Sequence, residues 1–146
     1  MKTIHRIAWT ACFLLAVLRL PAQSGKVDEA LEGFKKTSFM VQFLDLRTQM
    51  ETTARGFRKM LEQDGEGRFK PQDAQRVITG YEQSASRANA ILQGVVSDFL
   101  QQKKMRFIAR FPETYAKGLE LDLRNLSDFS VQNFHQPLAD LTAAEV

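Results

Sequence analysis

Two stretches of the chain carry apolar or small side chains at alternating steps of three and four residues, the spacing of one helical face. The first stretch comprises Phe39, Phe43, Leu46, Met50, Thr53, Phe57 and Met60. The second comprises Ile78, Tyr81, Ala85, Ala88, Leu92, Val95 and Phe99. The intervening Asp64-Gly65-Glu66-Gly67 is typical of a turn. The pattern predicts a helical hairpin in which Ala85 and Ala88 leave room for large side chains of the first helix.

The first helix should extend beyond its apolar stripe toward the N-terminus. Asp28 and Glu29 suit a first helical turn, because acids are favoured at the positive end of the helix dipole. We therefore expect one long helix over about residues 27–63, with a bend at Gly33 or Gly56.

The second helix should begin at Pro71, because proline at the first helical position lacks an N–H group that would be unpaired there anyway. It should end near Arg110, since cations gather in its last turns and Pro112 follows closely. These cations are Lys103, Lys104, Arg106 and Arg110.

A third, looser apolar face follows Pro112. Its members are Tyr115, Leu119, Leu123, Leu126, Phe129 and Phe134. Alternation over residues 119–123 also suits a strand, but leucine and glutamate favour a helix and no partner strand is evident. Gln136-Pro137 should end this helix near Phe134. The chain is thus predicted to be all-α: a long antiparallel helical hairpin completed by a third helix into a small up-down bundle.

Residues 1–22 have the layout of a secretory signal peptide, with cations followed by an apolar run over residues 7–18 and a small residue at Ala22. The apolar run is shorter than the roughly 20 residues of a membrane span. The single cysteine, Cys12, lies inside this run rather than after it, which argues against a lipoprotein. We expect a cleaved signal peptide over residues 1–22, with an uncleaved anchor as the alternative. Residues 23–146 should form a single helical-bundle domain that is periplasmic or secreted and has no stable membrane span.

Removal of the signal peptide changes the charge of the protein. The full chain has 20 Lys and Arg against 17 Asp and Glu, a net charge of +3. Residues 1–22 hold Lys2, Arg6 and Arg19 but no acid, so residues 23–146 carry 17 charges of each sign. The basic character of the full chain therefore does not indicate nucleic-acid binding, and no nucleic-acid partner is expected. Residues 23–146 also lack cysteine, so packing alone must hold the fold.

The turn between the first two helices is the one motif with candidate metal chemistry. Residues 62–73 resemble an EF-hand calcium loop, because Glu62, Asp64, Glu66 and Asp73 fall on four of its side-chain ligand positions and Gly67 on its sharp turn. The chain departs from the family at Glu62, where Asp is usual, and at Asp73, where a bidentate Glu is usual, and it has no second loop. The alternative is a solvated turn between helices in which glycine supplies a positive φ.

The basic run over residues 103–110 also has two interpretations. It suits the binding of phosphate, an anionic membrane surface or an acidic polysaccharide. Alternatively, it is a helix C-terminus whose cations complement the helix dipole, with Phe107 and Ile108 directed inward.

Catalytic motifs are absent from the sequence. His135 has no second histidine or cysteine in residues 23–146 with which to share a zinc ion. There is no serine on a glycine-flanked turn and no glycine-rich phosphate loop. We therefore expect no enzyme and no cofactor, but an exported helical bundle that binds or scaffolds a protein partner, or self-associates, through its helix faces. The alternative is a calcium-binding module built on residues 62–73.

Overall fold

The structure, a computed structural model, describes residues 24–64 and 67–144, and no strand occurs in these ranges. Its elements are α2 (Ser24–Lys35), α3 (Ser38–Gln63), α4 (Pro71–Leu100), α5 (Gln102–Arg110), α6 (Pro112–Gly118), α7 (Glu120–Ser130), the π-helical η2 (Val131–His135) and α8 (Gln136–Ala143). The predicted all-α class is confirmed. The predicted signal peptide over residues 1–22 lies outside the described residues.

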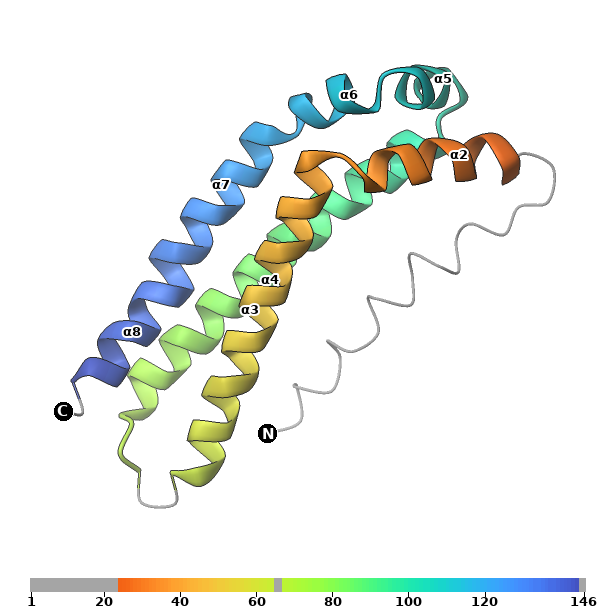
Figure 1. Cartoon of the computed structure of the whole chain (residues 1–146). Coiled ribbons are helices and arrows are strands. Elements are labelled where there is room, and N and C mark those ends of the chain that lie inside the picture. Colours follow the sequence, from red (N-terminus) through yellow and green to blue (C-terminus); the bar gives the residue numbers. More distant parts are fainter. Residues whose placement is uncertain (1–23, 65–66, 145–146) are drawn as a thin grey trace.

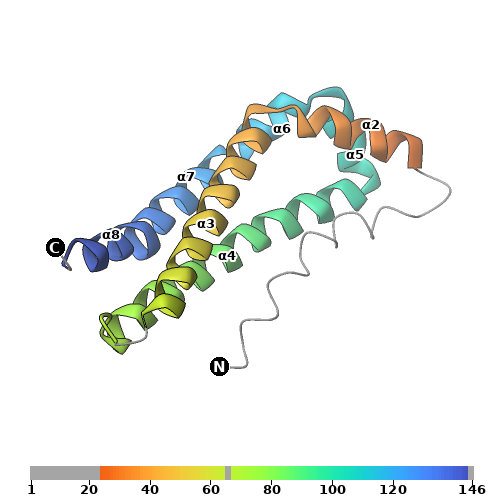
Figure 2. The same cartoon turned by 60° about the horizontal axis from the view of Figure 1, so that its bottom comes forward.

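The helices form three long rods and a cap at one end. Figure 1 shows α3 and α4 joined by a turn, with α6, α7, η2 and α8 running back beside them as one C-terminal rod (residues 112–143). At the end opposite the turn, α2 and α5 contact each other and bridge the tops of α3 and α4 (Figure 2). Most residues of the chain thus belong to the three rods, and the cap covers one end of them.

Apolar side chains form two core clusters along the molecule. The larger cluster lies toward the cap and contains Ala30, Phe34, Phe39, Met40, Phe43, Ala88, Leu92, Val95, Phe99, Met105, Ile108, Ala116, Leu123 and Leu126. The smaller cluster lies toward the turn and contains Met50, Phe57, Phe69, Ala74, Val77 and Phe134. The predicted stripe of the first helix contributes buried residues to both clusters. The predicted stripe of α4 is confirmed at Ala88, Leu92, Val95 and Phe99. Nearer the turn, the buried residues of α4 include Val77, Gly80 and Ser84, and the predicted Ile78, Tyr81 and Ala85 are only half-buried.

The first predicted helix is in fact two helices, and the break lies at neither predicted glycine. Thr37 has an extended backbone with φ −68° and ψ 152° and is the N-cap of α3. Its hydroxyl accepts a hydrogen bond from the Met40 N–H at 3.4 Å and donates one to the Phe34 carbonyl at 2.7 Å. The buried threonine thereby satisfies backbone groups of both helix ends, which makes a sharp turn stable.

The second predicted helix also ends early, at Leu100 rather than near Arg110, and Gln101 is extended. The reason is a change in hydrophobic register. Continuing the α4 stripe from Phe99 would bring Gln102 and Arg106 to the core. The apolar Met105 and Ile108 lie on the other side of that helix. The chain turns at Gln101, and α5 then buries both of them.

The C-terminal rod is helical, as predicted, but Pro137 does not end it. Proline cannot donate a hydrogen bond to the carbonyl four residues earlier, and its ring crowds that carbonyl, here the one of Asn133. The π-helical turn over Val131–His135 widens the backbone at this point, and the Gln136 N–H reaches back five residues to the Val131 carbonyl. The helix therefore passes the proline and continues through α8.

Helix α4 approaches the backbone of η2 closely at Gly80. A Cβ atom on Gly80 would lie only 1.7 Å from the Asn133 carbonyl oxygen and 2.6 Å from its carbon. One turn later the buried Ser84 donates a hydrogen bond to the Gly80 carbonyl at 2.8 Å. Ala88 is buried as predicted and Ala85 is half-buried. The close backbone approach of α4 at Gly80, however, faces the C-terminal rod.

Substitution of Gly80 tests this packing. We expect Gly80→Ala to lower the free energy of unfolding by about 3 kcal/mol or more, because backbone must move to admit the methyl group. Gly94→Ala is the matched control on the same helix, since a Cβ there meets nothing within 4 Å. It should raise stability by about 0.5–1 kcal/mol. Urea unfolding followed by circular dichroism measures both, and equal effects would contradict the contact.

Candidate functional site

The turn between α3 and α4 is organised around Asp64. One carboxylate oxygen of Asp64 accepts hydrogen bonds from the backbone N–H of Arg68 at 3.0 Å and its Nε at 3.1 Å. The other accepts one from the Phe69 N–H at 3.1 Å. Gly67 has φ +71°, a conformation that favours glycine. Phe69 then enters the core, with its ring centroid 6.0 Å from that of Phe57.

These hydrogen bonds set the charge state of Asp64, whose side chain is only 6% exposed. Burial by itself raises the pKa of the carboxyl, but the hydrogen bonds from Phe69 and Arg68 and the Arg68 charge together outweigh it. The pKa of Asp64 therefore lies below its ordinary value of 3.8. The carboxylate is ionised at neutral pH, and both of its oxygens serve the turn.

The four predicted calcium ligands are not gathered by the described part of the turn. Glu62 and Asp73 are exposed on α3 and α4, Asp64 is engaged as above, and Glu66 lies outside the described residues. Where the chain is described, no three His, Cys, Asp or Glu side chains are grouped as a metal site would require. Calcium binding by residues 62–73 therefore stays the alternative interpretation of this turn.

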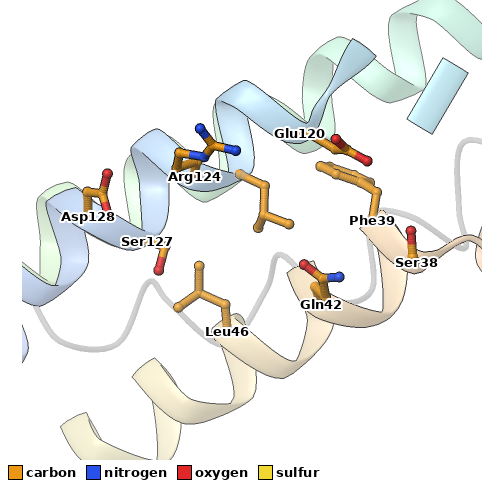
Figure 3. A pocket seen from close by; sticks show the side chains of 9 residues that line it. Ser38, Phe39, Gln42, Leu46, Glu120, Arg124, Ser127 and Asp128 are labelled. Carbon is orange, nitrogen blue, oxygen red and sulfur yellow. The ribbon is translucent and has the colours of Figure 1, made fainter. Parts of the chain in front are cut away.

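A different feature, a groove between α3 and α7, is a candidate binding site within the described part of the chain (Figure 3). Its volume is about 500 Å³. The lining residues are Ser38, Phe39, Gln42, Leu46, Glu120, Leu123, Arg124, Ser127 and Asp128. Phe39, Leu46 and Leu123 are its apolar part, and the other six are polar, so the groove joins a small apolar patch to a polar rim.

The two walls of the groove follow from helical spacing. On α3, residues 39, 42 and 46 recur at steps of three and four, and on α7 residues 120, 124 and 128 recur at steps of four. The α7 wall therefore presents Glu120, Arg124 and Asp128 in a row, an acid–base–acid pattern. From residue 119 onward the chain has five acids and one arginine, so this wall belongs to an acidic segment.

His135 lies in η2 and does not line this groove. Its ring centroid is 4.7 Å from that of Phe134, and it is half-buried. Burial lowers the pKa of the imidazole below its ordinary value of 6.5, so the ring is neutral at pH 7. The geometry therefore gives His135 a packing role.

The sequence pattern identified the apolar part of the groove but not its rim. Phe39, Leu46 and Leu123 belong to the predicted apolar faces. Gln42 and Arg124 carry no sequence signal, because polar residues on an exposed helix side look the same whether they face solvent or a second helix.

Comparison with known proteins assigns no family: no protein-family model, curated protein or solved structure matches the chain. Among the helices of the described ranges, none is both long and apolar enough to cross a membrane. Candidate functions must therefore be argued from the groove and from the surface of this chain alone.

The role of Asp64 predicts a specific pH dependence. A carboxyl with a lowered pKa stabilises the fold above its unfolded value of 3.8, and this contribution is lost as the pH falls toward the lower, folded value. We expect Asp64→Asn to lower stability at pH 7 and to differ less from the parent at pH 2. Urea midpoints at the two pH values measure this. A constant difference between the proteins would argue against the ionised cap.

The arrangement of the turn also bears on calcium. We expect calorimetric titration with millimolar calcium chloride to give no heat beyond dilution, because Glu62 and Asp73 are exposed on separate helices and are not grouped with Asp64 in the described part of the turn. Saturable heat that Asp64→Asn abolishes would instead establish a calcium site in residues 62–73.

Proposed function

We propose that this protein is an exported, non-enzymatic up-down helical bundle that binds a segment of a partner protein in the groove between α3 and α7. The observation that supports this most directly is the groove itself, in which a polar rim surrounds the half-buried Leu46 above a base formed by the buried Phe39 and Leu123. An apolar centre surrounded by polar groups is the usual arrangement of a protein interface.

The dimensions of the groove favour a helical or extended peptide. Each wall spans about eight residue steps, which corresponds to about 12 Å at 1.5 Å per residue, or roughly two helical turns. Six of the nine lining residues are polar. Small-molecule sites are instead lined mainly by apolar side chains and enclose most of their ligand. A short amphipathic helix laid along the groove is the occupant we favour.

The charges on the rim of the groove indicate which kind of partner segment would bind there. Glu120 and Asp128 lie one turn either side of Arg124 on the rim, within an acidic segment of the chain. A partner helix with basic residues beside one or two large apolar side chains would match both the rim and the patch. Rim charges chiefly set the association rate and the choice of partner.

Two further parts of the proposal rest on composition. The lining residues include the serines Ser38 and Ser127 but no histidine, cysteine or lysine to activate them, which supports a binding role over catalysis.

The signal-like residues 1–22 support export to the periplasm or beyond. Intact-mass analysis of the exported protein should then give a chain that begins at Gln23.

The proposal is tested with peptides selected on the protein from a random displayed library. We expect selected peptides to be basic and amphipathic, and amide shift changes on binding to centre on residues 38–46 and 120–128. Glu120→Lys combined with Asp128→Lys should weaken binding about tenfold, because it reverses the rim charge.

Asp122→Lys combined with Asp140→Lys is the matched control. It makes the same charge change in the same acidic segment, on exposed residues that do not line the groove. This control should alter affinity by no more than about twofold. Equal losses in the two double variants, or shift changes confined to another surface, would contradict the proposed site.

A further inference from the structure

The cap at the far end of the molecule presents large apolar side chains to solvent. Helix α5 buries Met105 and Ile108, while Phe107 on its other side is 46% exposed. Phe111, directly after the helix, is 44% exposed, and its ring centroid lies 5.5 Å from that of Phe107. Leu100, just before the helix, is 50% exposed. The sequence-based expectation that Phe107 is directed inward was therefore wrong.

Cations surround this aromatic pair. Lys103 and Arg110 lie four residues before and three residues after Phe107, hence on the same side of α5. The Arg110 guanidinium lies 5.2 Å from the centroid of the Phe111 ring. Helix α5 contains four cations and no acid, whereas α2 contains two cations and three acids, and residues 23–146 as a whole carry equal numbers of both signs. The positive charge of the cap is thus concentrated on α5.

A second groove, of about 370 Å³, lies beside the aromatic pair between α2 and α5. It is lined by Lys26, Glu29, Met105, Arg106, Ala109 and Arg110. Three cations and one acid border a small apolar base, and Arg110 belongs both to this groove and to the aromatic face. An anionic group seated in this groove would lie next to the exposed rings.

The cap is held firmly enough to present this face. The Tyr115 hydroxyl of α6 donates a hydrogen bond to Asp98 at 3.0 Å, and Lys104 donates one to the other Asp98 oxygen at 2.6 Å. Burial, followed by the hydrogen bond and charge of Asp98, raises the pKa of Tyr115, so the phenol remains a donor. These bonds tie the end of α4 to α5 and α6.

We propose that the α5 face, defined as Leu100, Lys103, Arg106, Phe107, Arg110 and Phe111, docks on the surface of an anionic phospholipid bilayer. Phe107 and Phe111 enter the boundary between headgroups and acyl chains, and the cations contact headgroup phosphates. Large apolar side chains beside several cations on one side of a helix are what such an interface binds. A soluble acidic polymer without apolar groups would match the cations but would leave the exposed rings in water.

A tryptophan placed at the contact reports insertion directly. The full chain is used, with Trp9→Phe to remove its single tryptophan and Phe107→Trp to introduce the probe. On vesicles of equal phosphatidylglycerol and phosphatidylcholine we expect a blue-shifted emission and quenching by brominated acyl chains. Vesicles of phosphatidylcholine alone should give neither effect. Leu121→Trp in the same background is the matched control, at an exposed apolar position on α7 away from the face.

Charge reversal tests the electrostatic half of the proposal. Lys103→Glu combined with Arg106→Glu should weaken binding to the anionic vesicles at least about tenfold. Arg55→Glu combined with Lys59→Glu changes the net charge equally on exposed residues of α3 and should have a much smaller effect. Raising the salt concentration should release the parent protein.

Three results would overturn the proposal. One is an emission of the Phe107→Trp variant that does not change on anionic vesicles. Another is an equal response from the Leu121→Trp variant, which would show non-specific adsorption. The third is binding to soluble polyglutamate that depends on Lys103 and Arg106 without any insertion of the tryptophan probe at position 107, which would assign the face to an acidic macromolecule instead.

Discussion

The contact between Gly80 of α4 and the Asn133 carbonyl of η2 is the constraint on which the arrangement of the rods depends. It needs two residues of the types that usually break helices. Gly80 has no Cβ to keep the backbones apart, and Pro137 leaves the Asn133 carbonyl without its usual helical donor. The widened turn then buries Phe134 completely, with its ring centroid 5.3 Å from that of Tyr81. The C-terminal rod is thereby positioned along α4.

The positions of both candidate binding surfaces follow from this packing and from two helix breaks. With the C-terminal rod held on α4, α7 comes beside α3, and their facing sides form the acidic-rimmed groove. The breaks at Thr37 and Gln101 turn α2 and α5 across the opposite end. Acidic charge therefore accumulates along the C-terminal rod, and basic charge on α5 of the cap. A molecule of this kind would hold a basic partner segment while resting on an anionic surface, which unites the two proposals.

Hydrophobic periodicity predicted the helical class, the apolar stripe of α3, the second half of the α4 stripe and the helical nature of residues 112–134. The break at Thr37 could have been predicted from the sequence. Two lysines typical of a helix end precede a threonine and a serine that are typical of the N-cap of the next helix. The break at Gln101 could have been predicted from the change of hydrophobic register between Phe99 and Met105. The structural roles of Gly80 and Pro137 could not have been predicted, because they depend on a contact between helices that are far apart in sequence. The polar rim of the groove could not have been predicted either, because Gln42 and Arg124 look in the sequence like polar residues on any solvent-exposed side of a helix.

The contact of the α4 and η2 backbones at Gly80 can be measured directly. The experiment is a nuclear Overhauser spectrum of isotope-labelled protein, read between the Gly80 α-protons and the Phe134 amide. A Cβ on Gly80 would lie 3.3 Å from the Phe134 nitrogen, so an α-proton in that direction must lie close to the amide proton. We expect a strong cross-peak between them. Its absence, with cross-peaks from Gly80 only to its own helix, would contradict the contact and the arrangement of the rods that depends on it.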